Sequence, residues 1–291
     1  MRSVIQGLLI ILMLGAASQS LANPLQAVPG FWKYWGDGMA EVAVYELTTE
    51  RYGEARTGYA VSIVVNEPWN LEHNVKSDTN KGPGVISALK LNLIRHFQTG
   101  VYDYHTMTSA FSALQAHPQV APHGALKLTF SAQEWCGQAF QALSFSKSAT
   151  TSHYHSYFEK SPQGSQSLEP LSSEDHLWLL ARNFQGLSIP TRLVRSLYDT
   201  RIHHRPLEPL DISHHRDGTR LIVETPRGNY TFTLGPLPFS PLQGWTTPWN
   251  EKATLLRSQR LPYWRLNSAE GLDALLDLGL NSASSRLKRS P

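Results

Sequence analysis

The chain has 291 residues, of which 41% are hydrophobic and 17% charged, and its formal net charge is +3. This is the composition of a globular protein, and so small a positive excess gives no reason to expect nucleic acid as a partner. The single cysteine excludes an intramolecular disulfide, and a chain of this length can bury enough surface to be stable without one.

The first 22 residues have the pattern of a secretory signal peptide. Arg2 gives a positive start, residues 8–14 form a short apolar core, and Ser20 and Ala22 supply the small side chains of a cleavage site. The apolar run is shorter than the roughly 20 residues of a membrane span. We expect an exported protein, periplasmic or secreted, with no transmembrane segment after cleavage. An uncleaved N-terminal anchor is the alternative.

Alternating apolar and polar residues predict antiparallel hairpins through the first half of the mature chain. One hairpin is predicted over 40–65 with its turn at 51–53, and a second over 89–107 with its turn at 98–100. A further strand is expected over 125–135. In the second half we expect a hairpin over 220–234 and a terminal strand pair over 253–266, with a proline at its edge.

Helix is scarce in the pattern. A capped helix is predicted over 172–184, with Leu177, Leu180 and Phe184 facing the sheet, and a short one over 268–278. The fold class is therefore mainly β (α+β): a strongly curved antiparallel sheet or open barrel with one or two packed helices. We expect one domain over 23–280, with an internal boundary near 160–172 as the alternative, and a disordered tail over 281–291.

Several blocks of the sequence resemble a known family. "WGDGMAEVAVYELTTERYGEARTGYAVSIVV", "LKLNLIRHFQTGVYDYHTMTSAF", "QEWCGQAFQ" and "RLPYWRLN" are similar to signature blocks of exported bacterial proteins of unknown function, sometimes labelled septum formation inhibitor Maf. The family supplies no established catalytic residues, and the α/β nucleotide pyrophosphatase fold of Maf enzymes differs from this strand-rich pattern. At the level of fold, the hairpins are similar to LolA/LolB lipoprotein carriers.

The lone cysteine in "SAQEWCGQAF" allows two interpretations. Cys136 follows a strand whose apolar face carries Leu126, Leu128 and Phe130, so extending the alternation predicts a buried, structural thiol. Glu134 on the same face then needs a partner such as Arg95 or Lys90, or it marks the rim of a pocket.

The alternative is a nucleophile in a thiol hydrolase. It would use Cys136 and a histidine such as His105, with Asp103 orienting the histidine and Gln133 near the oxyanion. On a strand, Asp103 and His105 share one face and Tyr102 and Tyr104 share the other. The same alternation also describes the wet face of a half-exposed sheet, which we favour.

Metal binding has little support. His153 and His155 are two residues apart and would share one face of a strand, so they are weak candidate ligands. The histidine doublets at 203–204 and 214–215 each offer at most one ligand to a site. We expect no cofactor.

The sequence leaves two classes of function. The favoured one is a non-enzymatic envelope protein that binds an apolar small molecule or an envelope protein, because the chain is rich in aromatic residues. The thiol hydrolase is the alternative. The candidate ligand contacts are Trp32, Trp35, Tyr102, Tyr104, Glu134 and Trp135.

Overall fold

Most of the chain forms β-strands. The computed structural model describes residues 29–114, 117–121, 124–182, 189–236 and 239–280. The strands of the first half are β1 (Ala40–Arg51), β2 (Glu54–Asn70), β3 (Val75–Lys76), β4 (Val85–Thr99), β5 (Tyr102–Ala113), β6 (Ala125–Glu134), β7 (Gly137–Phe145), β8 (Thr150–Ser156) and β9 (Gln163–Leu168). Those of the second half are β10 (Arg192–Val194), β11 (Pro209–Asp211), β12 (Ser213–Asp217), β13 (Arg220–Thr225), β14 (Gly228–Thr233), β15 (Gly244–Thr246) and β16 (Lys252–Leu261).

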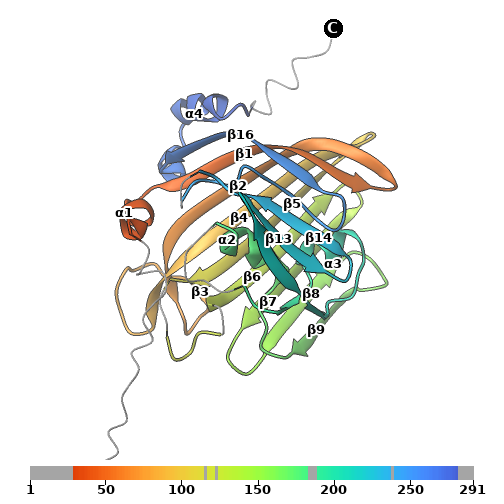
Figure 1. The fold of residues 1–291 in the computed structure, drawn as a ribbon, viewed down its shortest axis with the longest axis horizontal. Coiled ribbons are helices and arrows are strands. Elements are labelled where there is room, and N and C mark those ends of the chain that lie inside the picture. Colours follow the sequence, from red (N-terminus) through yellow and green to blue (C-terminus); the bar gives the residue numbers. More distant parts are fainter. Residues whose placement is uncertain (1–28, 115–116, 122–123, 183–188, 237–238, 281–291) are drawn as a thin grey trace, which may run out of the picture.

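One antiparallel sheet of 14 strands contains all of these except β10 and β11, which pair with each other (Figure 1). Its order is β12-β13-β14-β15-β16-β1-β2-β4-β5-β6-β7-β8-β9, with β3 beside β2. In the described chain the edge strands β12 and β9 do not pair, so the sheet stays open. The predicted fold class, a curved antiparallel sheet with few helices, is confirmed.

The predicted hairpins are present. The turn between β1 and β2 falls at Tyr52 and Gly53, both with positive φ, which is the geometry that a two-residue hairpin favours. The hairpins β4–β5 and β13–β14 also match the prediction. The strand pair predicted over 253–266 is wrong: residues 253–261 belong to one strand, β16, and Pro262 and a 3₁₀ turn (Tyr263–Arg265) follow it in place of a second strand. The Ser- and Gln-rich segment near 163 forms the edge strand β9.

Helical segments are short. They are α1 (Phe31–Trp35), the 3₁₀ helix Glu174–His176 continued by α2 (Leu177–Leu180), α3 (Leu197–Ile202), and a 3₁₀ turn (Ala269–Gly271) continued by α4 (Leu272–Asp277). Ser173 caps the second of these as predicted, since its hydroxyl accepts from the Asp175 amide at 3.3 Å. Phe184 and the predicted tail and signal peptide lie outside the described residues. No described helix is long and apolar enough to span a bilayer.

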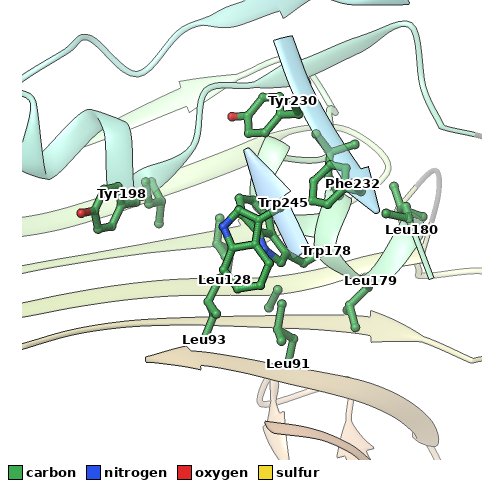
Figure 2. Close-up of a cluster of buried hydrophobic side chains, with 14 of the residues drawn as sticks. Leu91, Leu93, Leu128, Trp178, Leu179, Leu180, Tyr198, Tyr230, Phe232 and Trp245 are labelled. Carbon is green, nitrogen blue, oxygen red and sulfur yellow. The ribbon is translucent and has the colours of Figure 1, made fainter. Parts of the chain in front are cut away.

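The main core lies between the sheet and the short helices. Figure 2 shows Leu91 and Leu93 of β4 and Leu128 of β6 pointing toward Trp178 of α2. Aromatic side chains from several elements complete this cluster: Tyr198, Tyr230, Phe232 and Trp245. The protein's own side chains therefore cover this face of the sheet.

The opposite face of β1 and β2 is buried as well. Val42, Val44 and Val61 pack with Leu261 and with Leu278, which directly follows α4. The sequence predicts the alternation of these valines but not the segment that covers them. β1 is a central strand, because it pairs with β16 on one side and with β2 on the other, and both of its faces are buried.

Candidate functional site

A polar pocket of about 620 Å³ lies at the end of the sheet where β1 turns into β2. Its walls come from three parts of the chain: the β1–β2 turn, residues 195–208 around α3, and the segments at Arg227 and 248–250. The end of α3 is attached to that turn, because Arg51 Nη1 donates to the Ile202 carbonyl at 2.7 Å. Figure 1 shows α3 beside this end of the sheet.

Asp199 is the centre of the pocket floor. Its Oδ2 accepts from Arg195 Nη1 at 2.9 Å and from Arg227 Nη1 at 2.6 Å, and its Oδ1 lies 3.0 Å from His203 Nδ1. Burial alone would raise the pKa of Asp199, but hydrogen bonds with His203 and Arg195 and the charge of Arg227 outweigh it and lower the pKa. Asp199 is therefore a carboxylate that neutralises the floor.

Two further carboxylates, Glu174 and Asp175, bind the residues that form the pocket floor. Glu174 accepts from Arg227 Nη2 at 2.6 Å and from the Ser196 amide at 2.9 Å. Asp175 accepts from the Leu197 amide at 2.7 Å and from the Ser196 hydroxyl at 2.8 Å. These contacts fix the start of α3 with acceptors, as a helix N-terminus requires. Both carboxylates are buried, and burial raises the pKa of each despite these partners.

The mouth of the pocket carries two arginines that form no ion pair with a described carboxylate, although the charge of Glu134 acts on Arg51. Arg51 donates to the Tyr104 hydroxyl, at 3.1 Å from Nε and 3.0 Å from Nη2, in addition to the Ile202 carbonyl. The side chain of Arg205 is exposed and makes no hydrogen bond or ion pair with the described residues. Glu50 lines the same mouth and accepts from Asn250 Nδ2 at 2.8 Å.

Exposed apolar residues surround this end of the sheet. In an antiparallel meander every second turn lies at the same end, and the turns β1–β2, β4–β5, β6–β7 and β8–β9 do so here. Their residues form what we call the tip cluster: Tyr52, Val101, Tyr102, Trp135 and Tyr157. The Tyr102 hydroxyl donates to that of Tyr52 at 3.2 Å, and the ring centroids of Tyr102 and Trp135 are 6.4 Å apart.

Four of the predicted ligand contacts gather here. Tyr102 and Trp135 belong to the tip cluster, while Tyr104 is buried behind it with its hydroxyl 2.8 Å from that of Tyr52. Burial, followed by hydrogen bonding with Glu134, raises the pKa of Tyr104. Glu134 is thus next to Tyr104. The two suggested partners bind elsewhere, because Arg95 pairs with Glu251 and Lys90 with Glu67.

The two predicted tryptophans of "FWKYW" lie apart from this site on α1. Trp35 is buried beneath the guanidinium groups of Arg182 and Arg260, whose Cζ atoms each lie 5.3 Å from its ring centroid. It lines a different pocket of about 460 Å³ together with Glu67 and residues 85–87, at the opposite end of β2. Trp32 is partly exposed and does not line that pocket.

The prediction that Cys136 is buried is wrong. Cys136 is exposed and forms the β6–β7 turn together with Trp135, which is 70% exposed. The alternation of β6 ends at Glu134, and β7 begins at Gly137 with a φ of 156°. Extending a period-two pattern past the last paired residue therefore placed this side chain incorrectly. No described residue forms a hydrogen bond with its thiol.

The residues of the suggested hydrolase are not joined into a catalytic unit. His105 is exposed, as the alternation predicts, and it lies opposite Gln133 in the β5–β6 pair. Asp103, however, pairs with His96, whose Nε2 lies 2.8 Å from Oδ2. Burial, and then the nearby His96, lower the pKa of His105.

The suggested metal ligands His153 and His155 are both exposed on β8, on one face as predicted. The described residues contain no group of three or more His, Cys, Asp or Glu side chains that could hold a metal ion.

The sequence analysis missed most of the pocket. Arg195 and Asp199 are four residues apart, the spacing of an ion pair on one helical turn, and this was the available signal. Nothing in the sequence indicates that Arg227, 28 residues beyond Asp199, completes the cluster. Comparisons with family models, with curated proteins and with solved structures find no match to this chain.

Proposed function

We propose that the protein is an exported, non-enzymatic binding protein that takes the anionic group of a small molecule in the pocket above Asp199. The observation that carries the proposal is the pair Arg51 and Arg205, two cations that form no ion pair with a described carboxylate at the mouth of a 620 Å³ pocket. Guanidinium groups bind carboxylates and phosphates through paired, charge-assisted hydrogen bonds.

Neighbouring groups favour an anion with an apolar body. The pKa of His204 is lowered by burial and then by the positive charges of Arg51 and Arg201, so the local field is unfavourable to a further cation. Tyr52 lines the pocket with its ring 56% exposed and lies under the Arg51 guanidinium, 4.2 Å from Cζ to the ring centroid. The apolar part of the ligand would rest on this ring.

Titration calorimetry with phenyl phosphate at low salt tests the proposal. We expect saturable binding that is tighter than that of inorganic phosphate, because Tyr52 contacts the phenyl ring. Arg205→Gln should weaken it about tenfold, since a hydrogen bond to a charged group contributes about 1.5–3 kcal/mol. Arg216 is exposed on the distant edge strand β12, so Arg216→Gln is the matched control. Equal affinities for the two variants, or no saturation, would reject the anion site.

Export rests on the sequence of residues 1–22 and on the resemblance to exported bacterial proteins. We expect cleavage after Ala22, so the intact mass of protein purified from the cell envelope should lack the first 22 residues. A mass that includes them would contradict the proposed processing.

A further inference from the structure

The tip cluster exposes more apolar surface than a solvated turn needs. Val101, Trp135 and Tyr157 are 76%, 70% and 70% exposed, and they are the three most exposed large hydrophobic side chains of the described residues. Tyr52, at 56%, stands at the neighbouring turn. A grouped apolar surface of this kind marks an interaction site, whereas single exposed residues are ordinary.

Contacts between neighbouring turns join these side chains. The four turns lie at the same end of the sheet, Tyr102 contacts both Tyr52 and Trp135, and Tyr157 packs on the β6–β7 turn that carries Trp135. The positions are also fixed locally. The Tyr157 amide donates to the Gln138 carbonyl at 3.0 Å, and the Tyr157 ring lies directly over Gly137, where a Cβ would be 2.5 Å from the ring.

The residue types fit the boundary between water and lipid. Trp and Tyr combine an apolar ring with a polar group, and they concentrate where one end of the side chain is wet and the other is in hydrocarbon. Arg51 and Arg205 line the same pocket as Tyr52 of the tip cluster and form no ion pair with a described carboxylate, so they supply charges complementary to anionic headgroups.

We propose that the tip cluster docks the protein onto a lipid surface, with Val101, Trp135 and Tyr157 entering the interface and Arg51 and Arg205 facing anionic headgroups. This inference goes beyond the proposed ligand of the pocket. It shares Arg51 and Arg205 with that site, but the exposed side chains of Val101, Trp135 and Tyr157 carry it independently. A protein partner would use the same apolar tips, but it would give no binding to pure lipid vesicles.

Cys136 provides a built-in probe for the test. It is the single cysteine of the chain, is exposed, and adjoins Trp135 in the β6–β7 turn, so an environment-sensitive nitrobenzoxadiazole label there reports on docking. With vesicles of phosphatidylcholine containing 30% phosphatidylglycerol, we expect a blue shift and an increase in emission. Sedimentation of the unlabelled protein with the same vesicles checks that the label itself does not cause binding.

The variants decide whether the tips are responsible. Trp135→Ala combined with Tyr157→Ala should reduce vesicle partitioning at least tenfold. Trp264→Ala removes a 42% exposed tryptophan from the C-terminal region and should change partitioning less than twofold. All variants keep the same N-terminus, so any contribution from residues 1–22 is common to them. Arg205→Gln should reduce the preference for anionic over pure phosphatidylcholine vesicles.

The proposal is overturned if the unaltered protein fails to sediment with anionic vesicles, or if the tip variant binds as well as Trp264→Ala. Phenyl phosphate binding is measured separately in lipid-free solution. A failure to bind vesicles therefore rejects the docking proposal without rejecting the anion site in the pocket.

Discussion

At the scale of single residues, the arginines decide much of the structure. Arg95 is fully buried in the middle of the sheet, and its Nε and Nη2 donate to Glu251 at 2.7 and 3.1 Å. Glu251 also accepts from Trp245 Nε1 at 2.7 Å. Arg182 pairs with Glu41 in the same two-pronged manner, with Nη2 2.6 Å from Oε2. Both pairs join positions more than 140 residues apart.

Removing the Glu251 carboxylate should therefore lower the stability of the protein strongly. Glu251→Ala leaves the Arg95 guanidinium buried without its counter-charge, so we expect the free energy of unfolding in urea to fall by about 3–5 kcal/mol. The matched control is Glu54→Ala, which removes an exposed partner of Arg56 and should cost less than about 1 kcal/mol. If the two variants lose similar amounts, the buried pair does not stabilise the core as argued.

At Cys136, in contrast to Glu251, we expect substitution to have little effect on stability. Because its thiol is exposed in a turn, iodoacetamide should modify it in the native protein without unfolding. Cys136→Ser should change stability by less than about 0.5 kcal/mol, as is usual for surface positions. Slow labelling that requires denaturant would mean that the turn is packed against another part of the chain. Rapid labelling reports exposure and does not by itself indicate catalysis.

At the scale of elements, the strands were predictable and their neighbours were not. Leu89, Leu91 and Leu93 alternate with polar residues, and the same face continues to Arg95. The pattern therefore locates β4 and its core face, but it cannot indicate that Glu251 will meet Arg95 there. Likewise, Glu174 and Asp175 have the positions of first-turn helix residues, which are normally solvated. In the structure they are buried, because Glu174 accepts hydrogen bonds from the distant Arg227 and Asp175 accepts them from the start of α3.

Gly58 is a point where two elements approach closely. It lies in β2 opposite Phe97, and a Cβ on it would be 2.0 Å from the His96 carbonyl oxygen of β4. Backbone cannot yield as a side-chain end can, so Gly58→Ala should destabilise the protein by at least about 1–3 kcal/mol. Ser62→Ala, farther along the same strand, is the control and should cost less. Thermal unfolding followed by circular dichroism measures both, and a neutral Gly58→Ala would show that β2 and β4 have room to separate.

At the scale of the whole molecule, the short helices pack against one face of the curved sheet and form the core together with it. The fold class followed from alternating patterns within single strands and hairpins. The candidate site did not, because its pocket combines the β1–β2 turn with α3 and Arg227, and such contacts between distant segments leave no local pattern. The exposed tips were recognised only through their aromatic residue types at Tyr102 and Trp135.

A buried histidine in these helical segments also predicts how the stability of the protein depends on pH. His176 is buried beside Phe145, and burial lowers its pKa from 6.5 to about 4. Between these values the unfolded chain binds a proton that the folded chain does not, so stability is lost as the pH falls from about 6.5 toward 4. This group should account for about 2 kcal/mol between pH 7 and pH 5.

The measurement compares the free energy of unfolding in urea at pH 7 and pH 5 for the unaltered protein and His176→Gln. The variant is expected to be less stable overall but to lose about 2 kcal/mol less between the two pH values. The raised pKa values of Glu174 and Asp175 act in the opposite sense, but both proteins contain them, so they cancel in the difference. An identical pH dependence would contradict a neutral, buried His176.

The position of β16 between β15 and β1 has a consequence for shortened forms of this protein. β16 is the last described strand and pairs with β1, the first described strand, from Ala40 opposite Leu261 to Thr48 opposite Lys252. A chain that stops before residue 252 therefore lacks a strand from the interior of the sheet and not from its border. Such a fragment would present β1 as a long edge strand that other chains can pair with, and its valine, tyrosine and leucine side chains would favour that pairing despite Glu41 and Glu46. We therefore expect a fragment without β16 to aggregate unless the exposed edge of β1 is covered by another chain.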